Sequence, residues 1–300
     1  MTAVLQPFLP DGPAFSAEDF DAIARFIAEE AGLCLAESGQ ALVYSRLVRH
    51  VRRLGCSDFA QYINAVLADD SGKEREALVH ALTTNTTRFF REPAHYDIFA
   101  QDLLPDLIER ARNGGRVRFW SAGCSTGEEA YSLAAVILSK FPQAGQYDVR
   151  ILGTDINHLV LERAKEGIYP AEQTAGVPAP YLDLMFEPTV ATAQTRSIRG
   201  ELKAMVSFRY LNLVAPWPVQ GPFDAIFCRN VAIYMDQPTQ HLLWSGFEAV
   251  LAQKGMLFIG HSERLGADIS QRLRPCGPTA FHRAPPQAPS HQGETHVPQR

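Results

Sequence analysis

Residues 121–129 read Ser-Ala-Gly-Cys-Ser-Thr-Gly-Glu-Glu, and they stand between an apolar run at 117–120 and a helix-like stretch at 130–140. This order predicts a strand, a tight turn and the first turn of a helix. Two glycines, Gly123 and Gly127, permit a tight backbone, and the first N–H groups of the helix are free to face a ligand. The stretch therefore predicts a cradle for a small molecule.

The acidic pair Glu128–Glu129 decides which small molecule fits this cradle. Carboxylates at the turn repel a pyrophosphate, which argues against a dinucleotide, whereas a cation that carries an amino group fits well. S-adenosylmethionine has both a sulfonium and an ammonium, and it is the ligand we predict. The alternative is that both acids simply favour the positive end of the helix dipole.

The same turn also matches the G-x-S-x-G pattern of hydrolases that use a serine nucleophile. Ser125 would be the nucleophile, and Asp224 and His261 follow in the right order to complete a triad. Against this hypothesis, a single predicted strand precedes Ser125 and no glycine-rich oxyanion segment lies upstream. We keep the hydrolase as an alternative to the nucleoside site.

The composition is that of a globular protein with a full core. Apolar residues make up 46% and charged residues 20% of the 300 residues, which suits one large or two modest domains. The net charge of −5 argues against nucleic-acid binding, and no apolar run reaches the ~18 residues that a membrane helix needs. The five cysteines show neither a disulfide framework nor zinc-site spacing, so we expect a protein without metal in the reducing cytoplasm.

Residues 15–82 predict an all-helical N-terminal domain. Ser16 and Asp19 have the spacing of a capping box at the start of the first helix, and Gly32 would end that helix. The second helix, near Ser38–Leu54, contains no acid. It carries four arginines, at Arg46, Arg49, Arg52 and Arg53. A basic face without interleaved glutamates predicts a surface for an acidic partner, and a merely solvated helix face is the alternative.

From about residue 116 the pattern changes to strands that alternate with helices, which is typical of a mostly parallel sheet. The predicted strands are Val117–Ser121, Val149–Thr154, Val206–Leu211, Ala225–Cys228 and Met256–Gly260. The predicted helices are Glu128–Lys140, His158–Glu166 and Thr239–Leu251. Leu273–Cys276 and Thr279–His282 would form a closing antiparallel hairpin.

A segment with several prolines interrupts this alternation. Residues 170–203 lie between the second and third predicted strands and predict a small inserted β-subdomain. We expect it to contain a hairpin of Leu184–Glu187 with Ser197–Arg199. The last residues, 284–300, are rich in Pro, Gln and His and predict a disordered tail.

Polar residues follow several predicted strands, at the sheet edge where α/β proteins bind ligands. Asp155 ends the second strand, Asn212 the third, and Arg229-Asn230 the fourth. An acid at the tip of the second strand predicts a ligand for ribose hydroxyls, and a cap for the next helix is the alternative. Residues 83–92 read TTNTTRFFRE. We interpret them as a segment laid across the mouth of the site and anchored by its phenylalanines, with an ordinary linker as the alternative.

Five motifs, in this order, closely resemble the CheR family of chemotaxis receptor methyltransferases. They are Thr83–Glu92 (TTNTTRFFRE), Trp120–Tyr131 (WSAGCSTGEEAY), Gly153–Asn157 (GTDIN), Phe223–Asp236 (FDAIFCRNVAIYMD) and Gly260–Glu263 (GHSE). The resemblance implies an all-α domain at 15–82, a linker at 83–95 that contributes to the active site, and an α/β methyltransferase domain at 96–283 with a Rossmann-like sheet. That domain would bind S-adenosylmethionine and contain the β-subdomain at 170–203.

The resemblance also implies an activity. The family transfers the methyl group of S-adenosylmethionine to glutamate side chains of chemoreceptors, which forms methyl esters for sensory adaptation and leaves S-adenosylhomocysteine. The alternative is a module of the same fold that binds these nucleosides but has lost the transfer. We expect a cytoplasmic monomer that neither enters the membrane nor binds nucleic acid.

Individual residues take their expected roles from the same resemblance. Arg91 and Tyr234 would be the catalytic residues beside the transferred methyl group. The cofactor-binding residues would be Asn85, Thr87, Arg91, Glu128 or Glu129, Asp155, Asn212, Leu213, Arg229 and Asn230. The arginine face formed by Arg46, Arg49, Arg52 and Arg53 would bind the acidic helical bundle of the receptor.

Overall fold

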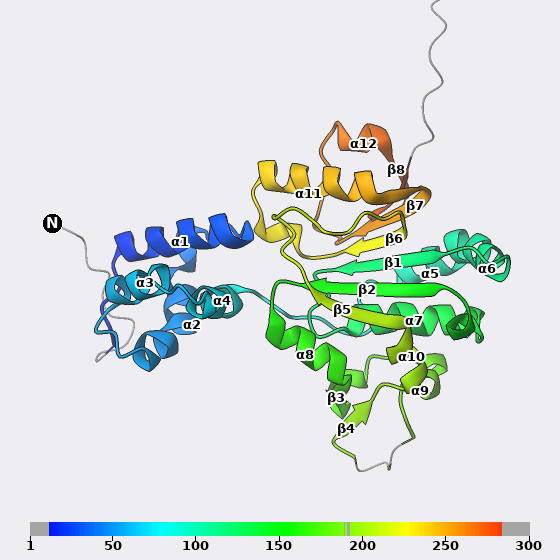
Figure 1. Cartoon of the computed structure of the whole chain (residues 1–300), viewed down its shortest axis with the longest axis horizontal. Helices are drawn as coiled ribbons and strands as arrows, with labels where there is room; N and C mark the ends of the chain where they lie inside the picture. Colours follow the sequence, from blue (N-terminus) through cyan, green and yellow to red (C-terminus); the bar gives the residue numbers. More distant parts are fainter. Residues whose placement is uncertain (1–11, 189, 191–192, 284–300) are drawn as a thin grey trace, which may run out of the picture.

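The computed structural model describes residues 12–188, 190 and 193–283 (Figure 1). The tail predicted at 284–300 lies outside the described residues. None of the helices in these ranges is long and apolar enough to cross a membrane.

One large sheet organises the second part of the chain, and seven strands of the described residues form it. From one edge to the other they are β5 (Val206–Tyr210), β2 (Val149–Asp155), β1 (Val117–Ala122), β6 (Phe223–Cys228), β7 (Leu251–Ile259), β9 (Ala280–Arg283) and β8 (Leu273–Gly277). The first five run parallel, and β9 pairs antiparallel with β7 and β8. The predicted parallel sheet with a terminal hairpin is confirmed. The strand order reverses between β1 and β6, where open sheets of this kind form their ligand crevice.

Helices cover both faces of this sheet (Figure 1). The helices that share one buried apolar cluster are α5 (Ala94–Ile98), α6 (Leu104–Arg112), α7 (Glu128–Lys140), α8 (His158–Glu166), α9 (Ala179–Met185) and α10 (Gly200–Met205). The helices of the opposite face are α11 (Gln237–Val250) and α12 (Ile269–Arg272). The prediction for α7 and α8 is confirmed, whereas α11 begins two residues before Thr239 because Asp236 caps it. The sequence analysis did not predict α5 and α6.

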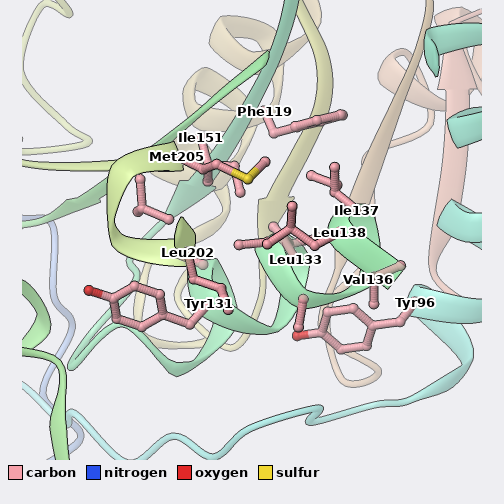
Figure 2. Close-up of a cluster of buried hydrophobic side chains, with 14 of the residues drawn as sticks. Tyr96, Phe119, Tyr131, Leu133, Val136, Ile137, Leu138, Ile151, Leu202 and Met205 are labelled. Carbon is pink, nitrogen blue, oxygen red and sulfur yellow. The ribbon is translucent and has the colours of Figure 1, made fainter. Parts of the chain in front are cut away.

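Alternating side chains of the strands build two cores. In β1, Phe119 belongs to the cluster under α7, while Trp120 belongs to the cluster under α11. Figure 2 shows the first cluster, where Phe119 lies with Leu133 and Ile137 of α7. The central strands are buried on both faces and mainly apolar, as is typical of parallel sheets. The sheet is therefore fixed from both sides, and the loops at its edge start from rigid strands.

The inserted segment differs from its prediction. A two-stranded sheet forms between β3 (Ile168–Pro170) and β4 (Thr195–Ser197). The expected hairpin of Leu184–Glu187 with Ser197–Arg199 is confirmed in part: an antiparallel bridge joins Phe186 to Ile198, but α9 extends through Met185 and limits the pairing to this bridge. Prolines in the first turn are compatible with a helix, so this stretch becomes α9 instead of a strand.

The N-terminal part consists of helices that the sequence predicts well. They are α1 (Ala17–Ala31), α2 (Gln40–Arg53), α3 (Phe59–Leu67) and α4 (Lys73–Leu82). The capping box is confirmed, because the Ser16 hydroxyl accepts from the N–H of Asp19 and the Asp19 carboxylate accepts from the N–H of Ser16. Gly32 ends α1 with a left-handed φ of 68°.

The end of α1 touches the sheet part of the chain. The Nδ2 of Asn212 donates to the carbonyl of Glu30 at 2.6 Å. The N–H of Cys34 donates to the carbonyl of Tyr234 at 2.7 Å. These two contacts place the connection between α1 and α2 at the carboxyl edge of the parallel strands, beside the crevice.

We predict that Gly127→Ala lowers the free energy of unfolding by about 2 kcal/mol or more. Gly127 has a φ of 94°, which alanine resists, and an added Cβ would stand 2.9 Å from the Cβ of Ala164. Gly145→Ala is the control, since its Cβ would meet nothing within 4 Å. Urea denaturation measures both variants, and equal midpoints would contradict the prediction.

Candidate active site

A pocket opens at the carboxyl edge of the parallel strands. The empty space inside it, with the open solvent at its mouth included, is about 1100 Å³. Its walls come from segments far apart in the sequence: 31–35, 82–87, 123–125, 155–156, 211–213 and 229–235, together with Arg91 and Glu129. This position is the crevice that the strand order predicts.

The turn after β1 forms the floor of the pocket. The N–H groups of Gly123 and Cys124 donate to the carbonyl of Thr154, and Ser125 takes a left-handed φ of 49°. This conformation lets the Ser125 N–H donate to the Asp155 carboxylate at 2.8 Å. The Asp155 carboxylate is thereby fixed at the tip of β2, facing the pocket.

Asp155 is buried, and burial raises its pKa, while hydrogen bonds from the N–H groups of Asn157 and Ser125 act in the opposite direction. Capping of α8 belongs to Asn157, whose side chain accepts from the N–H of Leu159. The capping alternative for Asp155 is therefore not needed. Its carboxylate keeps lone pairs for hydroxyl donors of a ligand.

The structure separates the two glutamates of the turn. Glu129 lines the pocket, and its carboxylate accepts from the Ser121 hydroxyl and from Nε of Arg229, both at 2.6 Å. Glu128 is also buried but does not line the pocket. Burial raises the pKa of Glu128, and a hydrogen bond from the Thr126 hydroxyl opposes this effect. Of the pair, Glu129 is placed to meet a cationic ligand.

Arg229 connects this glutamate to the next segment. The guanidinium is 8% exposed; besides Glu129, it donates to the carbonyl of Arg91 and to the hydroxyl of Tyr96. Burial alone would lower the pKa of Arg229, but the charge of Glu129 offsets this and raises the pKa above its usual range. Arg229 is therefore a permanent cation that holds both Glu129 and the backbone of Arg91.

The segment 83–92 lies along the pocket, as predicted. Phe89 and Phe90 are buried and anchor it. Asn85, Thr87 and Arg91 line the pocket. The Asn85 carbonyl accepts a hydrogen bond from the Ser125 hydroxyl. The Arg91 guanidinium donates to the carbonyl of Thr86. Asn85, Thr87 and Arg91 thus line the same pocket as the two carboxylates.

Residues that follow β5 and β6 complete the lining of the pocket, and β2 and β1 lie between these two strands. Asn212 and Leu213 follow β5, whereas Asn230 and Tyr234 follow β6. Tyr234 is 37% exposed. The Oδ1 of Asn230 is buried and has no hydrogen-bond partner among the described residues. The two carboxylates of the pocket, Glu129 and Asp155, are acceptors that fit the ammonium group and the ribose hydroxyls of S-adenosylmethionine.

One wall was missed by the sequence analysis. Ala31, Leu33, Cys34 and Leu35, between α1 and α2, line the pocket although they belong to the N-terminal part. The one local signal was Gly32, which ends α1 and turns the chain sharply. Nothing in these apolar residues indicates a ligand, since their position depends on contacts with the distant residue Tyr234.

The four arginines of α2 do not form one free face. Arg49 and Arg52 are exposed. Arg53 forms an ion pair with Glu74 at 2.5 Å. Arg46 is half-buried and donates to the carbonyls of Leu82 and Thr83. These carbonyls lie at the start of the segment that lines the pocket. Arg49 and Arg52 are thus the members of this set that point to solvent without such contacts.

The hydrolase alternative is wrong. The Ser125 hydroxyl donates to the carbonyl of Asn85 and faces no histidine. Asp224 lies near the amino end of β6, at the other edge of the sheet, where Arg110 binds it. His261 contacts Glu92 instead. The three residues do not assemble into a triad.

Known proteins match this chain over most of its length. Residues 18–83 match the family model "CheR methyltransferase, all-alpha domain", and residues 85–281 match "CheR methyltransferase, SAM binding domain". A probable chemotaxis protein methyltransferase of Rhizobium etli is 41% identical over 256 residues, which cover 85% of this chain and 96% of the relative.

Two further relatives give the same result. Chemotaxis protein methyltransferase 2 of Pseudomonas aeruginosa is 40% identical and covers 89% of this chain and 93% of the relative. The chemotaxis protein methyltransferase of Escherichia coli is 38% identical, and the match covers 89% of this chain and 91% of the relative. The chain therefore belongs to the CheR methyltransferase family and is an S-adenosylmethionine-dependent methyltransferase.

Proposed function

We propose that this enzyme is a protein-glutamate O-methyltransferase that acts on the cytoplasmic helical bundle of chemoreceptors. The observation that carries the proposal is that Arg91 and Tyr234, from segments far apart in the sequence, line the same pocket as Glu129 and Asp155. The names of the relatives support a chemotaxis substrate. We expect the protein to work as a monomer in the cytoplasm and to need no metal.

Each wall of the pocket would hold one part of the cofactor. The Glu129 carboxylate would accept the amino group, and Asp155 the ribose hydroxyls. Asn212, Leu213 and Asn230 would surround the adenosine. Thr87 and Asn85 would contact the methionine end.

The proposed reaction requires little proton transfer by residues of the protein. A receptor glutamate with an ordinary pKa of about 4.3 is already ionised at neutral pH, so no general base is required. When bound, S-adenosylmethionine supplies a methyl group on a positively charged sulfur, which the glutamate accepts as its ester. Arg91 would orient the incoming carboxylate through its planar fork. Tyr234 would close the site with its ring and offer one hydrogen bond, and both residues would exclude water.

The receptor would approach over α2. Arg49 and Arg52 present positive charge that an acidic helix attracts. Arg46 and Arg53, with partners inside the chain, would support this surface indirectly. The non-catalytic alternative has no observation in its favour, since the residues proposed for transfer all line the pocket.

Methyl transfer to receptor-containing membranes tests the proposal directly. We expect labelled methyl groups on the receptor that base releases as methanol, the signature of an ester. Tyr234→Phe and Arg91→Lys should each lower kcat about 10- to 100-fold, because transfer depends on close positioning. Calorimetry should show that Tyr234→Phe still binds S-adenosylhomocysteine. Tight binding of that nucleoside by the wild type without receptor labelling would favour the non-catalytic module.

A second prediction separates the two glutamates. Glu129→Gln should weaken binding of S-adenosylhomocysteine about 10- to 100-fold, because it removes a charged acceptor from the amino group. Glu128→Gln is the matched control: the same change, one residue away, buried but outside the pocket. Isothermal titration calorimetry measures both, and an equal loss of affinity would show that Glu129 has no special role.

A third prediction concerns α2. Charge reversal at Arg49 and Arg52 should raise KM for receptors roughly tenfold, with the effect shrinking at high salt, while cofactor affinity stays the same. Arg274→Glu is the control, because it is exposed on β8, at the opposite end of the molecule (Figure 1). Loss of cofactor affinity in the α2 variant would show a structural role for this face.

A further inference from the structure

The turn Gly260–Glu263 (GHSE) is the one motif whose role the proposed function leaves unexplained. It follows β7 at the same sheet edge as the pocket, and the N–H of Glu263 donates to the carbonyl of Gly260 to close it. None of its residues lines the pocket. Its contribution therefore has to pass through other residues.

The Glu263 side chain is 3% exposed and is surrounded by backbone donors. One carboxylate oxygen accepts from the N–H groups of Val231 and Ala232 at 3.0 and 2.7 Å. The other accepts from the N–H groups of Asn230 and Gly260 at 3.1 and 2.5 Å. Burial raises the pKa of Glu263, and these hydrogen bonds oppose that effect. Converging N–H groups of this kind form a site for an anion, here supplied by the chain itself.

The three donors at 230–232 belong to the turn that carries Tyr234. Asn230 has a left-handed φ of 60°, and the 3-10 helix η5 (Ala232–Tyr234) begins two residues later. The first N–H groups of a helix have no partner within the helix, and a buried donor without a partner is costly. Without the carboxylate, this turn would have to rearrange to satisfy them.

Other contacts hold the far end of the same turn. The N–H of Cys34 donates to the carbonyl of Tyr234 at 2.7 Å. The Nε2 of Gln240 donates to the carbonyls of Ala232 and Met235 at 3.0 and 2.9 Å. The backbone around Tyr234 is thus fixed at both ends, although its ring stands at an open mouth.

We propose that Glu263 is a positioning residue for methyl transfer: its buried carboxylate shapes the 230–232 turn and so sets where the hydroxyl of Tyr234 stands. This inference rests on the proposed function, in which Tyr234 faces the transferred methyl group. It also explains Gly260, since a Cβ there would lie 2.8 Å from the backbone nitrogen of Asn230 and 2.9 Å from Oε2 of Glu263. A glycine is needed for the turn and the carboxylate to approach each other.

Glu263→Gln tests this proposal with little change of shape. The amide nitrogen would face two N–H donors in place of an acceptor, so half of the contacts are lost. We expect kcat to fall about 10- to 100-fold, with KM for the receptor almost unchanged, because the α2 surface is untouched. The affinity for S-adenosylhomocysteine, measured by calorimetry, should change less than kcat.

A double-mutant cycle distinguishes positioning from general damage. In the Tyr234→Phe background, Glu263→Gln should reduce kcat much less than in the wild type, because the hydroxyl that it positions is already gone. If Glu263→Gln lowers kcat by the same factor in both backgrounds, or leaves kcat unchanged, the role of Glu263 is overturned and that of Tyr234 is not affected. If Tyr234→Phe by itself leaves kcat unchanged, the proposed role of Tyr234 fails, and this inference fails with it.

Two further variants control for folding. Glu248→Gln removes a partly buried carboxylate that pairs with Arg272 and Arg283, away from the pocket, and should leave kcat unchanged. Glu263→Asp keeps the charge but shortens the side chain, and it replaces Glu263→Gln in the cycle if that protein does not fold. If Glu263→Asp leaves kcat at the wild-type value in both the wild-type and the Tyr234→Phe background, the proposal is overturned.

Discussion

The buried ion pair between Arg229 and Glu129 is the contact on which the rest of the pocket depends. It joins the end of β6 to the start of α7, and the same guanidinium holds the backbone of Arg91. Removing one partner of a buried pair typically costs about 3–5 kcal/mol, since it leaves a charge without compensation. The guanidinium therefore links the Glu129 carboxylate to the backbone of Arg91, and both residues line the pocket.

The sheet explains why this pair can be buried at all. Side chains of β1 alternate between the two apolar clusters, so this central strand is covered on both faces and its register is fixed. Rigid strand ends then place loop residues with little freedom, as the left-handed Ser125 and its bond to Asp155 illustrate. Irregular backbone of this kind persists at sites where the surrounding structure determines it.

The features that the sequence predicted depend on residues close together in the chain, and the features that it missed depend on distant residues. The capping box at Ser16, the cradle at 121–129 and the helix α7 follow from residues close together in the chain, and the structure has them. The inward turn of Arg46 and the pocket wall at 31–35 depend on partners tens or hundreds of residues away. The hairpin at Leu184–Glu187 is reduced to one bridge because part of this stretch is helical, and helix and strand patterns are hard to distinguish in short apolar runs.

The wall at 31–35 has a consequence for engineering. The connection after α1 is covalently part of the N-terminal helices, yet it completes the pocket and holds the carbonyl of Tyr234. A chimera that takes its helices from a relative with another receptor preference would import a foreign pocket wall along with them. Grafts that retarget this enzyme should leave Ala31–Leu35 native and exchange only the outer surface of α2.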